Sequence, residues 1–180
     1  MSCSKVALIY DAHQLKRRRR FRLAAVLTAI SLLAALFALY QVAFAYTWST
    51  STVDGTGTNV GPYTSIAAVD ASNLFISYYD GTNGDLKFAR STNGGSTWST
   101  SIVDGTGMVG QYTSIAAVDA STIFISYHDY SNIGLKFAKS TNGGTSWSTS
   151  IVDHSDMVGL YTSIAAVDAS TIFISYHDYL

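Results

Sequence analysis

The chain divides into an unbroken apolar run near its N-terminus and a longer region in which apolar and polar residues alternate. Residues 23–46 are almost entirely apolar, and a run of this length is typical of a helix that can cross a bilayer. From residue 47 onward, short segments rich in β-branched and aromatic residues are separated by Gly, Asn, Asp and Ser. This is the pattern of strands joined by turns. The sequence therefore predicts one hydrophobic helix followed by an all-β region.

The β region is repetitive, with a period of 49 residues. The octapeptide Tyr-Thr-Ser-Ile-Ala-Ala-Val-Asp begins at Tyr63, Tyr112 and Tyr161, and residues 112–130 are identical to residues 161–179. A period of about 40–50 residues made of short strands is typical of the four-stranded blades of a β-propeller. The predicted units are full blades over 63–104 and 112–153, a partial blade over 161–180 and a leading strand over 47–54.

Each full period also contains a glycine-rich turn followed by a tryptophan. Residues 91–98 read STNGGSTW and residues 140–147 read STNGGTSW. Asn-Gly-Gly supplies the positive backbone dihedrals of a tight hairpin, and an Asn side chain can bond to its own turn. We expect Asn93 and Asn142 to stabilise these turns, and Trp48, Trp98 and Trp147 to fill the space between sheets.

This turn resembles the Asp-box, S-x-D-x-G-x-T-W, with Asn in place of Asp. The resemblance is to bacterial neuraminidase repeat proteins of the sialidase-type β-propeller superfamily, and it extends from about residue 46 to residue 180. It implies blades packed side by side, with the boxes on the face opposite the ligand. The residues that carry the match are Ser91, Asn93, Gly95, Trp98, Ser140, Asn142, Gly144 and Trp147.

The number of predicted strands bears on whether a propeller can close. The β region yields eleven strands, one short of three four-stranded blades, whereas closed propellers have about four to eight blades. The predicted fold is therefore an incomplete or oligomer-completed β-propeller behind one N-terminal helix. Either the chain is a fragment of a longer repeat protein, or copies associate as a homo-oligomer that completes the ring.

Charge is distributed unevenly along the 180 residues. Residues 1–22 hold seven of the eleven basic side chains, whereas the region from Tyr46 onward holds eleven Asp, no Glu and four cations, a net charge of −7. An acidic domain argues against nucleic acid as a partner, because phosphate binding depends on Lys and Arg. Cys3 is the only cysteine, so the fold must be held by packing without an intrachain disulfide.

The N-terminal segment predicts export. A basic n-region over 1–22 precedes the apolar segment 23–45, and Ala43-Phe44-Ala45 is a small-x-small pattern for cleavage before Tyr46. The alternative is an uncleaved membrane anchor over residues 23–46, with the basic residues in the cytoplasm. Both alternatives place the repeats outside the cytoplasm. Residues 18–23 also resemble a twin-arginine pattern, although four successive arginines contain such a pair by default.

One face of the predicted blades gathers Asp, His and Tyr side chains, because alternate loops of antiparallel strands share an end. Such side chains can bond to sugar hydroxyls and stack on sugar rings, although repeated turn-forming residues would give the same pattern. Residues 80–85 do not match a calcium loop, and the sequence predicts neither a metal site nor a cofactor. The candidate ligand-binding residues are Asp80, His128, Asp129, Tyr130, His177, Asp178, Tyr63, Tyr112 and Tyr161.

The charged residues of the β region weigh against catalysis. Sialidases hold the substrate carboxylate with three arginines and use a tyrosine activated by Glu, whereas this β region has Arg90 alone and no Glu. Three guanidinium groups at one site suit bidentate carboxylate capture. The sequence predicts an exported, non-catalytic module that binds carbohydrate or another surface macromolecule. The alternatives are a glycoside hydrolase that uses Asp, and a repeat fragment without independent activity.

Overall fold

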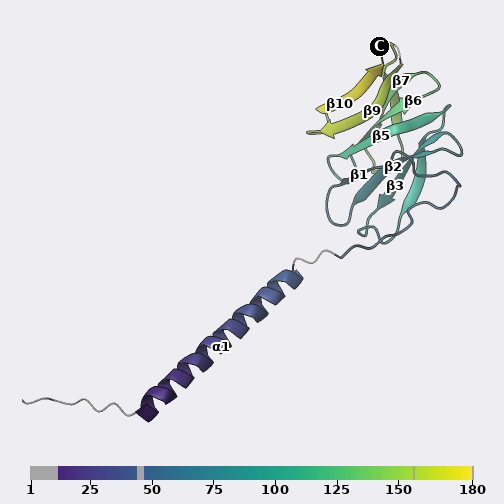
Figure 1. Ribbon diagram of the computed structural model, residues 1–180. Helices are drawn as coiled ribbons and strands as arrows, with labels where there is room; N and C mark the ends of the chain where they lie inside the picture. Colours follow the sequence, from purple (N-terminus) through teal and green to yellow (C-terminus); the bar gives the residue numbers. More distant parts are fainter. Residues whose placement is uncertain (1–11, 44–46, 156, 180) are drawn as a thin grey trace, which may run out of the picture. The chain divides into compact units, whose positions relative to one another are not determined.

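The computed structural model describes residues 12–43, 47–155 and 157–179 (Figure 1). The N-terminal part contains one helix, α1 (Ala12–Ala43). Within it, Arg19–Phe37 has a mean hydropathy of 1.8 and is long and apolar enough to cross a membrane. The helix is thus compatible with either a signal peptide or an anchor. The predicted cleavage site at Ala45–Tyr46 includes residues outside the described ranges.

The repeats form antiparallel sheets in which neighbouring strands follow each other along the chain. Sheet 1 has the order β1-β2-β3-β4, sheet 2 the order β5-β6-β7-β8, and sheet 3 pairs β9 with β10. The ten strands agree with the predicted segments, apart from differences at their ends. Their bounds are β1 Ser65–Ala68, β2 Leu74–Asp80, β3 Asp85–Ser91, β4 Ser99–Asp104, β5 Val109–Ala117, β6 Ile123–Asp129, β7 Gly134–Ser140, β8 Ser148–Asp153, β9 Met157–Ala166 and β10 Ile172–Tyr179.

The predicted leading strand over 47–54 is wrong. These residues form no strand, and the Trp48 side chain is 93% exposed, so it does not fill a space between sheets. The Trp98 and Trp147 side chains are half-buried, and the Trp147 ring meets the Phe88 ring edge-on, with centroids 5.1 Å apart. Trp147 therefore packs sheet 2 against sheet 1, as expected.

The glycine-rich turns have the predicted internal bonds. The Asn93 Oδ1 atom accepts hydrogen bonds from Ser91 Oγ and Thr97 N, each at 2.9 Å, and Gly95 N donates to Ser91 Oγ. The second turn repeats this arrangement around Asn142. Asn thus performs the turn-stabilising role expected of it, through one acceptor oxygen shared between side chain and backbone donors.

The main apolar core lies between sheets 1 and 2. Phe75 and Leu86 of sheet 1 belong to one buried cluster with Ile115, Ile125 and Tyr127 of sheet 2. Strand residues alternate between the two faces of a sheet, so Phe75 lies on the face of sheet 1 toward sheet 2 and Ile76 on the other face. A sheet packed on both faces needs apolar residues at both alternations, which explains the fully apolar start of β6.

The contacts between neighbouring sheets repeat with the sequence period. Thr113 Oγ1 donates to Ser77 Oγ at 3.0 Å, and 49 residues later Thr162 Oγ1 donates to Ser126 Oγ at 2.7 Å. The backbone N–H groups of Ile115 and Ile164 donate to Ser65 Oγ and Ser114 Oγ, each at 3.2 Å. Sheet 2 therefore packs on sheet 1 in the same way as sheet 3 packs on sheet 2.

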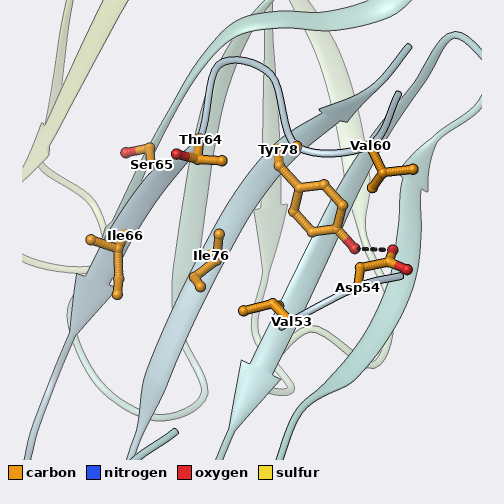
Figure 2. A pocket seen from close by; sticks show the side chains of 9 residues that line it. Val53, Asp54, Val60, Thr64, Ser65, Ile66, Ile76 and Tyr78 are labelled. Atoms are coloured by element: carbon orange, nitrogen blue, oxygen red, sulfur yellow. Dashed lines mark hydrogen bonds between the residues drawn. The ribbon is translucent and has the colours of Figure 1, made fainter. Parts of the chain in front are cut away.

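The other face of sheet 1 carries a hollow of about 350 Å³. Figure 2 shows Ile66 and Ile76 on adjacent strands, with Val53, Val60 and the Tyr78 ring around them. The Tyr78 hydroxyl donates to Asp54 Oδ2 at 2.7 Å at one end of the hollow. This face corresponds to the face that sheets 2 and 3 use for packing on their predecessors.

Candidate binding site between the second and third sheets

Three tyrosine rings follow one another across the three sheets, tilted by 46° and 56° between neighbours, and we call this row the tyrosine stack. The ring centroids of Tyr63 and Tyr112 are 4.5 Å apart, and those of Tyr112 and Tyr161 are 4.6 Å apart. Burial, together with the neighbouring Tyr63 and Tyr161, raises the pKa of Tyr112 to about 12. The octapeptide repeat thus brings together three of the predicted ligand residues from positions 49 residues apart.

Each tyrosine of the stack has a positive φ, between 51° and 57°. A left-handed backbone is unfavourable for a bulky residue and is found where surrounding structure imposes it. At Tyr112 it coincides with a register shift, because Gln111 pairs with His128 whereas the next pair is Ser114 with Ser126. Bulges of this kind redirect a side chain, and here the bulge accompanies the placement of Tyr112 in the stack.

A cavity of about 300 Å³ lies beside this stack, between sheets 2 and 3. Its volume is at the lower end of the range of small-molecule pockets. Among the residues that the structure describes, none of those lining it carries a formal charge at neutral pH. The lining residues are Gln111 and Tyr112 of β5, His128 of β6, Tyr130, Ser131 and Ile133 of the β6–β7 loop, and Met157 and Leu160 of β9.

His128 is a buried polar residue in the lining of this cavity. Its side chain is buried, and neither ring nitrogen has a hydrogen-bond partner among the described residues. Burial lowers the pKa of His128, although the Asp129 carboxylate opposes the shift. A neutral imidazole has one N–H donor and one acceptor nitrogen. Both nitrogens are shielded from solvent, so the cavity lining must shift before ligand hydroxyls can bond to them.

Two aromatic rings lie next to His128. The centroid of the Tyr112 ring lies 6.1 Å from that of His128, and the Tyr130 ring lies 6.3 Å away, both edge-on. The Tyr130 side chain lines the cavity and is 57% exposed. The site thus combines a buried polar group with an accessible aromatic face.

The corresponding position between sheets 1 and 2 has a different composition. Tyr79 stands where sheet 2 has His128, and Gly81 stands where sheet 2 has Tyr130. Gly84, with φ of 83°, is replaced by Ile133, with φ of 54°. A β-branched residue in the left-handed region costs about 1–2 kcal/mol. The sequence analysis did not identify Gln111, Ser131, Ile133, Met157 or Leu160, although the break in the repeat at Ile133 was a usable signal.

The predicted acidic ligand residues have structural contacts instead. Asp80 accepts hydrogen bonds from the backbone N–H groups of Thr82 and Asn83, and Asp129 accepts one from Asn132. Both carboxylates are buried in their own turns and do not line the cavity. Asp178 is exposed, and the exposed His177 ring lies edge-on to Tyr161 at 6.3 Å.

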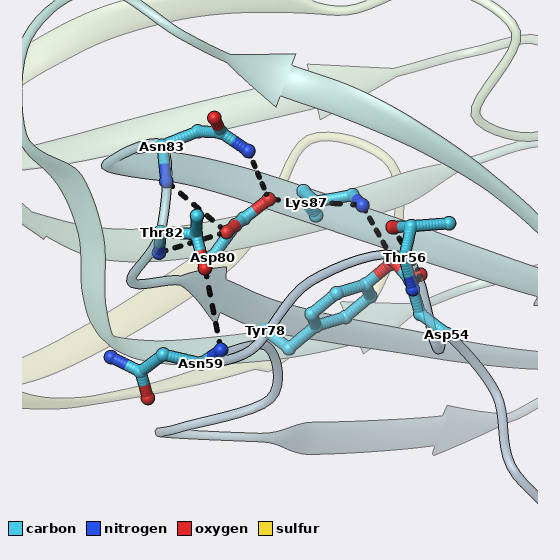
Figure 3. Close-up of polar contacts among 8 residues, drawn as sticks. All are labelled: Asp54, Thr56, Asn59, Tyr78, Asp80, Thr82, Asn83 and Lys87. Atoms are coloured by element: carbon cyan, nitrogen blue, oxygen red, sulfur yellow. Dashed lines mark hydrogen bonds and ion pairs between the residues drawn. The ribbon is translucent and has the colours of Figure 1, made fainter.

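A carboxylate, tyrosine and lysine cluster recurs at the ends of the sheets (Figure 3). Asp54 Oδ2 accepts hydrogen bonds from Tyr78 and Lys87, and Asp104 Oδ2 accepts them from Tyr127 and Lys136. Burial alone would raise the pKa of Asp104, but the bonds from Lys136 and Tyr127 outweigh it and lower the pKa. Because the donors satisfy these carboxylates, we assign the cluster a structural role.

Arg90 lies in another part of the β region. Its guanidinium donates to the backbone oxygen of Gly143 at 3.2 Å and borders a hollow formed with the second glycine-rich turn. It does not line the cavity around His128. Within the described ranges, no group of three His, Cys, Asp or Glu side chains is arranged to hold a metal ion.

Comparison with known proteins does not assign the chain to a family. No protein-family model matches it, and no curated protein matches it. The candidate function therefore depends on the geometry of the cavity.

Proposed function

We propose that this protein is an exported, non-catalytic binding module that recognises a neutral sugar through the cavity around His128. The main support is the buried imidazole, whose two nitrogens have no partner among the described residues. A sugar hydroxyl can both donate and accept a hydrogen bond. Two hydroxyls from different parts of the ligand, one near each nitrogen, would therefore match the donor and acceptor of a neutral imidazole.

The rest of the lining supports a neutral ligand. The Tyr130 ring offers an apolar surface on which a sugar ring can stack, and Ile133 and Met157 add apolar contact. The described lining residues include no Lys or Arg, which favours an uncharged hexose over a sialic acid, whose carboxylate would require cationic partners.

We also propose a fold family for the repeats. The stacked antiparallel sheets and the Asn-centred turns support blades of a sialidase-type β-propeller with Asp-boxes. The position of the candidate cavity also agrees with this assignment, since it lies at the ends of the sheets where the β6–β7 loop emerges. The apolar helix supports export or anchoring at a membrane.

The test is glycan binding by the full chain held in lipid nanodiscs. We expect the chain to bind immobilised glucose-, galactose- or mannose-terminated glycans in preference to sialylated ones. Tyr130→Ala should weaken binding about tenfold, because a lost aromatic stacking contact is worth about 1.4 kcal/mol. The side chain is exposed, so the fold should survive.

Two methionines give a matched control. Met157 lines the cavity, whereas Met108 has the same place one period earlier and does not line it. Met157→Ala should weaken binding, and Met108→Ala should leave it unchanged. Failure to bind any neutral glycan, or equal binding by the wild type and Tyr130→Ala, would reject the proposal.

A further inference from the structure

The outer face of sheet 1 has the composition of an interface, but no sheet covers it and only the segment containing Val53, Asp54 and Val60 borders it. The Ile66 side chain is 63% exposed, whereas its counterparts Ile115 and Ile164 are 6% and 8% exposed. Those two isoleucines lie on faces that pack against a preceding sheet. Sheet 1 therefore presents the same apolar position without a sheet against it.

The outer face of sheet 3 is uncovered in the complementary way. The Phe173 side chain is 63% exposed, whereas its counterparts Phe75 and Phe124 are completely buried. Phe75 belongs to the core between sheets 1 and 2, on the face that receives the following sheet. Phe173 therefore occupies the position that would meet a following sheet.

The two interfaces inside the chain show how these faces would fit together. In each of them, a threonine of the later sheet donates to a serine of the earlier one, as Thr113 does to Ser77. The counterparts on the uncovered faces are Thr64, which directly precedes β1 of sheet 1, and Ser175 of sheet 3, and both are exposed. Donor and acceptor thus lie on opposite faces of the same chain.

The backbone and aromatic contacts have the same complementarity. The N–H group of Ile66 corresponds to that of Ile115, which donates to Ser65 Oγ, and the exposed Ser163 corresponds to Ser65. The tyrosine stack ends with Tyr161 on sheet 3 and begins with Tyr63 on sheet 1. Contact between these faces would continue the stack.

We propose that the outer face of sheet 1 binds the outer face of sheet 3 of a second copy of this chain, with Phe173 of one copy in the hollow formed by Ile66 and Ile76 of the other (Figure 2). The interface is head-to-tail, because two different faces meet. Such interfaces produce closed rings or open filaments, depending on the angle. This association is independent of sugar binding by the His128 cavity.

Cysteine cross-linking of the full chain in nanodiscs tests the register. In a Cys3→Ser background, Thr64→Cys combined with Ser175→Cys should form disulfides between copies under mild oxidation. Ser77→Cys with Thr113→Cys is the matched control, because these two oxygens are 3.0 Å apart within one chain. Thr64→Cys alone should not form a dimer, because a head-to-tail interface does not bring identical positions together.

A charge placed on the interface gives an independent readout. Ile66→Asp should lower the yield of the Thr64–Ser175 cross-link at least about tenfold, because an unpaired carboxylate would be buried. Ile102→Asp is the control, since Ile102 is 56% exposed on the outer strand β4 of the same sheet, and it should leave the yield unchanged.

Two results would overturn the proposed interface. Monomers in the Thr64–Ser175 variant, together with closure of the Ser77–Thr113 control, would overturn the proposal and leave these faces to another occupant. A cross-link that Ile66→Asp and Ile102→Asp affect equally would also overturn it.

Discussion

At the scale of single residues, the distinction between His128 and its repeat counterparts defines the site. Tyr79 occupies the corresponding position of sheet 1, and His177 occupies that of sheet 3 but is exposed. Only in sheet 2 does burial place an imidazole inside a cavity with two ring nitrogens lacking partners among the described residues. The neighbouring sheets supply this burial, so the site belongs to the assembled repeats.

The lowered pKa of His128 predicts that the protein loses stability in mild acid. Above its ordinary pKa of about 6.5, the imidazole is neutral in both the folded and unfolded chains. As the pH falls from there toward the lower folded-state pKa, the unfolded chain takes up a proton that the folded chain does not, so the free energy of unfolding decreases. Urea unfolding followed by tryptophan fluorescence at pH 7.5, 6.5 and 5.5 measures this free energy of unfolding.

The control for this pH effect uses residues that the chain already contains. His128→Tyr copies the buried tyrosine of sheet 1, and it should reduce the loss of stability between pH 6.5 and 5.5. His154→Gln changes an exposed histidine after β8 and should retain the wild-type profile. An unchanged pH profile in His128→Tyr would contradict the assignment.

At the scale of elements, the first strand of each later sheet approaches its predecessor through a glycine. A Cβ atom added at Gly110 would lie 2.7 Å from Leu86 Cα, and one at Gly159 would lie 2.8 Å from Leu135 Cα. These residues also have positive φ values. Glycine is therefore required for two reasons at once, the backbone conformation and the close approach of neighbouring sheets.

Two alanine substitutions separate these reasons. Gly61 has φ of 107°, similar to 103° at Gly110, but a Cβ at Gly61 would meet nothing within 4 Å. Gly61→Ala should therefore show only the cost of backbone strain, and Gly110→Ala should lose about 1–3 kcal/mol more through overpacking. If both variants lost the same free energy of unfolding in urea, the close contact between Gly110 and Leu86 would be contradicted.

At the scale of the whole molecule, the described repeats form one compact unit over Thr50–Leu180. Sheet 2 covers sheet 1 and sheet 3 covers sheet 2 through the same set of contacts. Asp104 adds a polar contact between sheets, because it ends β4 of sheet 1 and bonds to Tyr127 and Lys136 of sheet 2. Contacts between neighbouring repeats make their unfolding cooperative.

Removal of the Asp104 carboxylate should weaken the contact between sheets 1 and 2 and lower the free energy of unfolding. Asp104→Ala leaves Lys136 with Asp129 at 3.7 Å, and loss of one partner of a buried ion pair costs about 3 kcal/mol. Asp153 holds the same place one period later but is more exposed, and it bonds to Tyr176 and Ser155. Asp153→Ala should cost less. Equal unfolding midpoints for the two variants in urea would contradict the role of Asp104.

The sequence by itself determined the local structure. Strand-forming residues at alternating positions, Asn-Gly-Gly turns and the 49-residue period were sufficient to predict ten strands and an apolar helix, because these signals act over a few residues. The same pattern gave a false strand over 47–54. Those residues resemble β4 and β8 in sequence, but they lie outside all three described sheets and so lack the hydrogen-bonded strand partner that β4 and β8 have.

Only the tertiary structure decided which of the repeated residues form a site. Asp80, Asp129 and His128 lie on the same predicted face, yet the two carboxylates are bonded within their own turns, whereas His128 borders a cavity. The tyrosine stack and the cavity join side chains from sequence positions 49 residues apart. Burial and partners depend on how one sheet packs on the next, and a local sequence pattern does not specify which side chains that packing brings together.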